Sequence, residues 1–449
     1  MEQILLRLVL YKDLNEDSIL KVLGKIINQI ENRSFDMDSA DDSSSNGRYQ
    51  ILGQLNQAVY QLLEVANEYG FEHNLWKHYV AYLIAMNENP FSLSQEGYGL
   101  VDGSMKELGK EDFKQLMKLF FYDFAKVEEK LHSSVLRSVL DYKSSALSKS
   151  SYLKGVGDKI KELESALDLC KNEDEMYDSV TAFYKQYGVG QIGLNKAFRI
   201  LEKEDGPALS PIVHTQQADL SSLIGYELQK KQLLDNTEAF INGLKCNNVL
   251  LFGDSGTGKS TSVKAILNQY YPQGLRMIEL YKHQFSSLSE LISLLKHRNY
   301  KFIIFMDDLS FEEFEIEYKY LKAVIEGGLE VKPDNILIYA TSNRRHLIRE
   351  TWSDRSDMSK DELHHSDTME EKLSLVSRFG ITINFSKPNP REFIEIVKGI
   401  ALMEGIAFDE EELVKEANMW ELRHGGRTGR TAKQFIHYLL GQEQAGKSE

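Results

Sequence analysis

The spacing of apolar residues divides the chain into two parts with different expected structures. Through residues 51–66 and again through 113–124, apolar side chains recur every three or four positions, the period of a helix that packs one face on a core. The first half is therefore predicted to be mostly α-helical. The first stripe comprises Ile51, Leu52, Leu55, Val59, Leu62, Leu63 and Ala66, and the second comprises Phe113, Leu116, Met117, Phe120, Phe121 and Phe124.

The second half alternates short apolar segments with helical patterns. Continuous apolar runs of this length are typical of strands buried on both faces of a parallel sheet. The predicted strands are 249–252, 302–306, 336–340 and 381–385. Helical spacing follows in 391–404, 410–423 and 428–440, which we expect to form a small C-terminal helical lid. This order of elements predicts an α/β fold with a parallel sheet, preceded by a helical domain.

Proline and small polar residues mark the expected boundaries. Pro90 is the only proline before Pro207, whereas the second half is punctuated by turns. Residues 36–47 are almost entirely Asp, Ser, Asn and Gly, a composition typical of a loop. The predicted division is a helical N-terminal domain at 1–203, a linker at 204–217, an α/β core at 218–387, a helical lid at 388–441 and a loose tail at 442–449.

Charge and composition narrow the classes of function. The 449 residues include 53 Lys and Arg against 68 Asp and Glu, and a net charge of −15 disfavours tracking of a nucleic-acid backbone by the whole surface. No apolar run approaches the ~20 residues of a membrane span, and the N-terminus has no signal-peptide pattern, so a cytoplasmic protein is expected. The distant Cys170 and Cys246 predict neither a disulfide framework nor a zinc site.

A phosphate-binding motif follows the first predicted strand. The pattern Gly-x-x-x-x-Gly-Lys-Ser occupies residues 253–260 between a strand and a helix, a context that a merely structural glycine turn does not require. Its backbone N–H groups surround the β-phosphate, Lys259 neutralises β- and γ-phosphate oxygens, and the Ser260 hydroxyl ligates Mg²⁺. The predicted ATP-binding residues here are Gly253, Asp254, Ser255, Gly256, Thr257, Gly258, Lys259, Ser260 and Thr261.

Carboxylates follow the next buried strand. Asp307 and Asp308 come directly after 302–306, where parallel sheets bind ligands at the carboxyl ends of their strands. Asp307 is predicted to hold the Mg²⁺ shell, and Asp308 to orient or polarise the attacking water. Glu312 and Glu313 are alternative acids for the second role. A helix cap is the structural alternative for the pair.

A polar amide ends the strand after that. Asn343 follows 336–340, and its side chain is suited to hydrogen-bond both the γ-phosphate and the attacking water. An ordinary turn asparagine in left-handed geometry is the alternative interpretation.

These motifs together resemble those of the AAA+ ATPases over roughly residues 218–440. The resemblance rests on the P-loop, the paired aspartates, Asn343, Arg378 just before the last strand, and Arg430 on a C-terminal helix. Within AAA+, the phrases at 307–312, 339–347 and 429–435 look like a bacterial group known only by a domain of unknown function. Many AAA+ proteins carry Asp-Glu where this chain has two aspartates.

The resemblance assigns further roles to single residues. It implies that Asn343 is the sensor-1 residue, Arg378 the arginine finger and Arg430 the sensor-2 residue, with Arg427 competing for that last place. Ile224 and Gly225 correspond to the segment that packs on adenine. An arginine finger completes the site of a neighbouring subunit, so a homo-oligomer is expected.

Two functions from different classes remain open. The first is an ATP hydrolase with ATP and Mg²⁺ as cofactors, which acts on an unknown protein or nucleic-acid partner. The second is a nucleotide-gated switch or adaptor with negligible turnover. A small-molecule kinase has no need of the sensor-2 helix, and no ABC-type signature is present. The acidic segment 352–369 is interpreted as a solvated loop and not a metal site, because adjacent His364 and His365 cannot easily face one ion from a helix.

Overall fold

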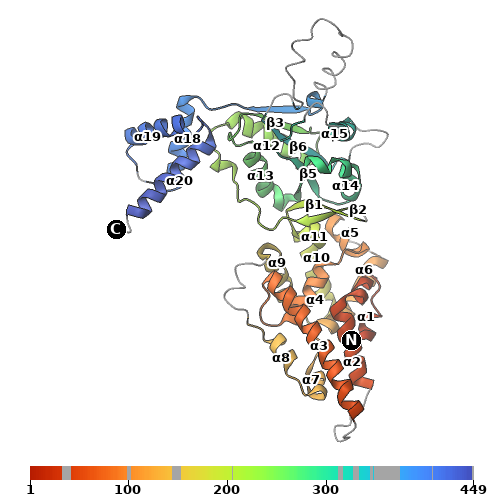
Figure 1. The fold of residues 1–449 in the computed structure, drawn as a ribbon. Helices are drawn as coiled ribbons and strands as arrows, with labels where there is room; N and C mark the ends of the chain where they lie inside the picture. Colours follow the sequence, from red (N-terminus) through yellow and green to blue (C-terminus); the bar gives the residue numbers. More distant parts are fainter. Residues whose placement is uncertain are drawn as a thin grey trace. The chain divides into compact units, whose positions relative to one another are not determined.

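The chain folds into two compact units, Met1–Asn195 and Lys196–Glu449, each of which is described separately. The computed structural model describes residues 1–32, 42–98, 103–143, 153–204, 206–311, 317–326, 333–343, 347, 375–406 and 408–446. Figure 1 labels the helices and strands along the chain. The boundary between the units lies after Asn195, just before the strand that starts at Ala197. The sequence places the end of the helical domain eight residues later, at 203.

The first unit is built from helices, as the apolar stripes predict. Its α-helices are α1 (Glu2–Leu5), α2 (Ser18–Asn32), α3 (Asp42–Tyr69), α4 (Leu75–Met86), α5 (Pro90–Tyr98), α6 (Ser104–Phe120), α7 (Ala125–Leu131), α8 (Val135–Leu140), α9 (Lys154–Asp168), α10 (Glu173–Tyr187) and α11 (Gly190–Leu194), with a 3₁₀ helix η1 at Lys12–Glu16. Side chains start several of them: Asn74 accepts from the N–H of Lys77 at the start of α4, at 3.1 Å.

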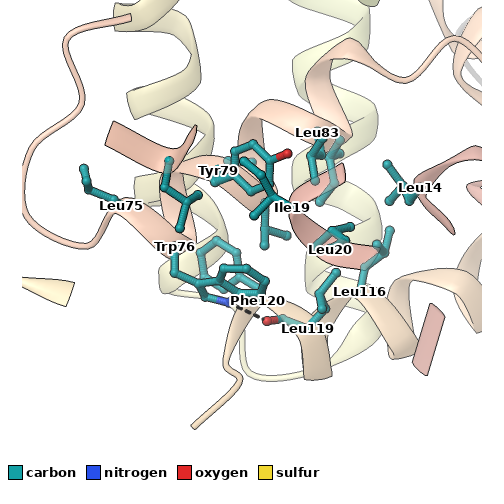
Figure 2. Close-up of a cluster of buried hydrophobic side chains, with 14 of the residues drawn as sticks. Leu14, Ile19, Leu20, Leu75, Trp76, Tyr79, Leu83, Leu116, Leu119 and Phe120 are labelled. Carbon is teal, nitrogen blue, oxygen red and sulfur yellow. Dashed lines mark hydrogen bonds between the residues drawn. The ribbon is translucent and has the colours of Figure 1, made fainter. Parts of the chain in front are cut away.

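Large apolar side chains from α2, α4 and α6 meet in the core of this unit (Figure 2). Trp76 is 2% exposed, and its indole N–H donates to the carbonyl of Leu119 at 2.8 Å. The buried hydroxyls of Tyr11 and Tyr184 lie 2.8 Å apart, and Tyr184 donates to the carbonyl of Ile84 at 2.7 Å. These three aromatic side chains thus bury their polar atoms with hydrogen-bond partners, which avoids the cost of burying them unsatisfied.

A buried carboxylate ties the N-terminus to α6. Asp112 is fully buried and accepts the backbone N–H groups of Val9, Leu10 and Tyr11 at 2.9, 2.8 and 3.0 Å. Three such donors to one carboxylate offset the cost of removing its charge from water. The sequence pattern does not predict this contact, because its partners lie about a hundred positions apart.

Two details of the helical half differ from prediction. Helix α3 begins at Asp42, so the predicted loop at 36–47 is wrong over its last six residues, and its first residues lie outside the described part. Phe121 lies past the end of α6 and is 41% exposed, where the Lys77 ammonium sits 4.9 Å from its ring centroid. The helical part of the stripe therefore ends at Phe120, whereas Phe124 lies past the turn and is buried in the core as predicted.

The second unit is organised around one seven-stranded sheet. Its strands are β1 (Ala197–Lys203), β2 (Gly206–Pro211), β3 (Val249–Gly253), β4 (Leu275–Glu279), β5 (Lys301–Met306), β6 (Ile336–Ser342) and β7 (Ile381–Phe385), in the order β2-β1-β4-β5-β6-β3-β7. Neighbouring strands run parallel except for the antiparallel pair β1–β2. The four predicted strands are confirmed as β3, β5, β6 and β7.

The hairpin β1–β2 and strand β4 were not predicted. Strand β2 occupies the middle of the predicted linker, and its register pairs Lys203 with Gly206. The dipeptide Asp205-Gly206 is a hairpin signal that the sequence does contain. The two prolines of β2 favoured the interpretation as a linker, because proline is disfavoured in central strands. Proline is tolerated at the edge of a sheet, where β2 lies.

Helices flank the sheet and form the C-terminal lid. They are α12 (Glu227–Ile241), α13 (Lys259–Tyr270), α14 (Leu288–Leu295), α15 (Glu317–Glu326), α18 (Pro390–Met403), α19 (Glu410–Arg423) and α20 (Gly429–Gly446), with 3₁₀ helices η3 (Leu220–Ser222), η4 (Tyr271–Gln273) and η5 (Lys282–Ser287). Asn389 and Glu392 form a reciprocal cap at the start of α18, and Asp409 caps α19. The lid helices share a separate apolar core around Phe393.

The C-terminal helix is longer than predicted. Helix α20 continues to Gly446, so the predicted tail at 442–449 is wrong for its first five residues. Gln, Glu and Ala at these positions are good helix formers. Gln442 also donates to the Tyr438 hydroxyl one turn earlier, at 2.7 Å. Among the helices described in the chain, none is long and apolar enough to cross a membrane.

Candidate functional site

The loop between β3 and α13 has the backbone shape that its glycines allow. Gly256 and Gly258 have φ angles of 77° and 98°, which favour glycine. A Cβ on Gly258 would lie 2.4 Å from Leu223 Cδ1, and one on Gly256 would lie 3.1 Å from the Cβ of Arg430. Larger residues at either position would therefore push the loop away from its neighbours. The loop ends where α13 begins, so the N-terminus of α13 faces the site.

Lys259 is held at the mouth of this loop. Its ammonium donates to the carbonyls of Gly253 and Asp254 at 2.9 and 2.6 Å, and to Asn343 Oδ1 at 3.1 Å. The residue is only 6% exposed. Burial lowers the pKa of Lys259 below the usual lysine value, and the negative charge of Asp254 offsets part of this shift. A desolvated cation beside a ring of backbone N–H groups is suited to a polyphosphate.

One hydroxyl connects the two aspartates after β5. Ser260 Oγ and Thr341 Oγ1 both donate to Asp307 Oδ1, each at 2.5 Å. The same Thr341 hydroxyl accepts the backbone N–H of Asp308 at 2.9 Å. Ser260 comes from α13, and Thr341 comes from β6, so the contacts join the phosphate loop to two neighbouring strands.

The oxygens of Ser260 and Asp307 fit a magnesium ion. Mg²⁺ prefers oxygen ligands and is commonly bound by one or two protein groups together with substrate phosphates. Among the residues that the structure describes, no group of three or more His, Cys, Asp or Glu side chains could form a metal cage. The Ser260 and Asp307 oxygens suit an ion that takes its remaining ligands from phosphate and water.

Asp308 and Asn343 form the second half of the polar network. Asp308 adopts the left-handed region, with a φ of 53°, and its Oδ1 accepts the Asn343 Nδ2 at 2.7 Å. The other end of the same amide accepts the Lys259 ammonium. Asn343 thus bridges the P-loop lysine and the second aspartate. A non-glycine residue in this backbone region is uncommon and is often found at functional sites.

These groups line a cavity of about 620 Å³. Residues 255–261 of the P-loop lie in its wall together with Asp307, Asp308, Thr341 and Asn343. The lid contributes Arg430 and Lys433 from α20, and the N–H of Arg430 donates to the carbonyl of Gly256 at 3.1 Å. Arg427 does not line the cavity, and its guanidinium lies 3.6 Å from the Glu421 carboxylate.

A family model covers this whole arrangement. The family described as "Protein of unknown function (DUF815)" matches residues 194–443, more than half of the chain. The chain belongs to the DUF815 family. A largely parallel sheet flanked by helices, with further helices at the C-terminus and a helical N-terminal region before it, confirms the predicted α/β fold class. The resemblance to a group with a domain of unknown function is also confirmed.

Solved structures of RuvB from Thermotoga maritima are similar to this DUF815 chain. A proline-to-glycine variant is 18% identical over 52% of this chain and 68% of its own, with a TM-score of 0.37. The RuvB Holliday junction branch migration motor is 17% identical over 50% of this chain and 73% of its own, with a TM-score of 0.30. A comparison with curated proteins found no match.

Some predicted site residues of the DUF815 chain lie away from the cavity wall. Gly253 and Gly225 are not part of the wall, whereas Ile224 is. The Asp254 carboxylate instead accepts the backbone N–H of Lys387 at 2.9 Å. Arg378 is half-buried in the turn before β7 and does not line the cavity of its own chain. Glu312, Glu313 and residues 352–369 lie outside the described part.

Sequence reasoning overlooked two polar residues of the site. Thr341 lies just past the predicted strand 336–340 and was given no role, although β6 extends to Ser342 and the Thr341 hydroxyl faces the end of β5. Lys433 lies one turn after Arg430, so helical spacing alone places both on one face of α20. Combining that periodicity with the sensor-2 resemblance would have found Lys433. The contact of Thr341 with Asp307 could be predicted only from the order of the strands in the sheet.

Proposed function

We propose that this chain is an Mg²⁺-dependent ATP hydrolase that couples turnover to conformational work on a macromolecular partner. The observation that carries the proposal is the continuous network from Lys259 through Asn343 to Asp308, on the wall of one cavity. It supports binding of the triphosphate and placement of the attacking water by the same set of side chains.

The chemistry of each side chain suits it to one role in binding or hydrolysis of Mg-ATP. Lys259 and the P-loop N–H groups are suited to bind the β- and γ-phosphates, and Ser260 and Asp307 would hold Mg²⁺, which supplies charge neutralisation when bound. Asp308 and Asn343 are suited to orient a water molecule for in-line attack. Arg430 enters from the lid, where it can sense the γ-phosphate and move α20 with it.

A nucleotide-gated switch is the second candidate. The Asp308 carboxylate is shorter than the glutamate of many AAA+ proteins, and one of its oxygens already accepts the Asn343 amide. Both features favour slow turnover. The two functions differ in one measurement, which is steady-state phosphate release from Mg-ATP by the purified full chain.

Sustained release that disappears in Lys259→Ala would support the hydrolase. Tight Mg-ATP binding without release above the level of the Lys259→Ala variant would support the switch. Failure of the wild-type chain to bind Mg-ATP by calorimetry would refute both.

Thr341→Val should slow hydrolysis by roughly 10- to 100-fold with a small change in ATP affinity. The variant keeps the volume of a buried side chain but removes the hydroxyl that connects Asp307 to the Asp308 N–H, and groups that support metal ligands have effects of this size. Thr341→Ser keeps the hydroxyl and should retain most activity. Measured kcat and KM would contradict the role if serine is as defective as valine.

Arg430→Ala should reduce kcat more than Arg427→Ala does. Arg430 lines the cavity, whereas Arg427 pairs with Glu421. Loss of a charge that meets the transferring phosphate raises the barrier, whereas loss of a surface ion pair changes little. Steady-state rates for the two variants, compared at saturating ATP, check this assignment. A larger defect in Arg427→Ala would reverse it.

A further inference from the structure

Asn268 makes a contact that the proposed chemistry does not use. It lies on α13, the helix that begins at the P-loop lysine. Its Nδ2 donates to the backbone carbonyls of Gln216 and Ala218 at 3.0 and 2.8 Å, while its Oδ1 accepts the Lys196 ammonium at 2.8 Å. The lysine fixes the orientation of the amide, because only an oxygen can face it. Both amide donors are thereby directed at the segment 216–218.

That segment forms part of the cavity wall. Gln216, Gln217 and Ala218 all line the 620 Å³ cavity. The wall that they share also includes the apolar side chains of Leu223, Ile224, Ile396 and Ile400. Apolar side chains are suited to cover a flat base and cannot bind phosphate. The part of the cavity to which 216–218 belongs therefore suits the base of the nucleotide.

We propose that Asn268 is a positioning residue for the base, which sets nucleotide affinity and selectivity by clamping residues 216–218 against the cavity. This inference rests on the proposed nucleotide binding and assigns a second task to the P-loop helix. The start of α13 faces the phosphates, and Asn268 on the same helix holds the backbone of residues 216–218 at the base. One helix then fixes the distance between the two parts of the site.

The clamp leaves the backbone N–H and C=O of one residue, Gln217, for the ligand. The carbonyls on either side of Gln217 are held by Asn268, and the Ala218 N–H donates back to the Gln216 carbonyl at 2.9 Å. Within the described residues, the Gln217 backbone groups have no such partner. An N–H donor beside a C=O acceptor matches the N1 and N6 positions of adenine, whereas guanine presents the opposite pattern at N1 and O6.

The test separates the base from the phosphates. Binding of Mg-ATP, Mg-GTP and Mg-tripolyphosphate to the full chain is measured by calorimetry for Asn268→Ala and Asn268→Asp. The aspartate keeps the shape and the partner Lys196 but turns an oxygen toward two carbonyls. Gln269→Ala is the matched control, since Gln269 is the exposed next residue of the same helix.

Both Asn268 variants should bind Mg-ATP about tenfold more weakly, the cost of losing the hydrogen bonds that order residues 216–218. Their affinity for Mg-tripolyphosphate should match wild type, and their ratio of ATP to GTP affinity should fall. The Gln269→Ala control should be unchanged.

Equal losses for ATP and tripolyphosphate would overturn the proposal, because Asn268 would then act on the P-loop itself. Unchanged ATP affinity, or equal losses for ATP and GTP, would overturn it as well. Tripolyphosphate binding also shows that each variant is folded. If wild type binds neither ATP nor tripolyphosphate, the proposed function fails, an outcome distinct from failure of the clamp.

Discussion

Lys259→Ala is expected to weaken Mg-ATP binding by roughly 10- to 150-fold, because one hydrogen bond to a charged group contributes about 1.5–3 kcal/mol. The residue is nearly fully buried, and its ammonium is aimed into the phosphate loop by three oxygen acceptors. Calorimetry with Mg-ATP and with Mg-tripolyphosphate measures the loss, which should be equal for both ligands. Wild-type affinity in this variant would refute the assignment of the P-loop as the phosphate site.

In the chain without ligand, Lys259 should lower the free energy of unfolding. Because burial lowers the pKa of Lys259 in the folded chain, the folded state binds its proton less strongly than the unfolded state does. This cost is present at neutral pH and disappears as the pH rises through the lowered pKa and up to that of unfolded lysine. Lys259→Met, which retains the apolar stem, should therefore unfold at a temperature no lower than wild type. That result would separate a binding defect from misfolding.

The strands around the site could be predicted because their burial leaves a simple pattern. Strand β5 is covered on both faces and is a continuous apolar run from Phe302 to Met306. The P-loop is equally local, since eight consecutive positions carry its chemistry. The hairpin β1–β2 is at the sheet edge, where partial exposure and two prolines weaken the same signal.

The finer parts of the site depend on contacts between distant positions. Thr341 meets Asp307 only because β6 lies beside β5, and Asn268 reaches Gln216 across fifty-two positions. No local pattern carries either contact. The backbone of Asp308 gives a physical reason for the departure from Asp-Glu: among non-glycine residues, Asp and Asn best tolerate the left-handed region. A glutamate at 308 would meet a backbone shape that favours the shorter acid.

Arg378→Ala is expected to reduce hydrolysis by about 10³- to 10⁵-fold while leaving Mg-ATP affinity nearly unchanged. An arginine supplied by a neighbouring subunit meets charge that develops mainly in the transition state, which gives effects of this size. Arg378 lies outside the cavity wall of its own chain, just before β7, the strand at one edge of the sheet. Buried Phe379 anchors the turn that carries it, so the side chain starts from a fixed place.

An arginine that completes the site of another subunit can act only in an assembly. The chain should form a homo-oligomer whose specific activity rises with protein concentration. Mixing Arg378→Ala with Lys259→Ala should restore part of the hydrolysis, because the first variant keeps a phosphate site and the second still offers its arginine. Arg391→Ala is the matched control, since Arg391 is 90% exposed and pairs with Glu395 on the surface of α18. If light scattering finds a monomer with ATP, and its specific activity is independent of concentration, each site is completed within one chain and Arg378 has a structural role only.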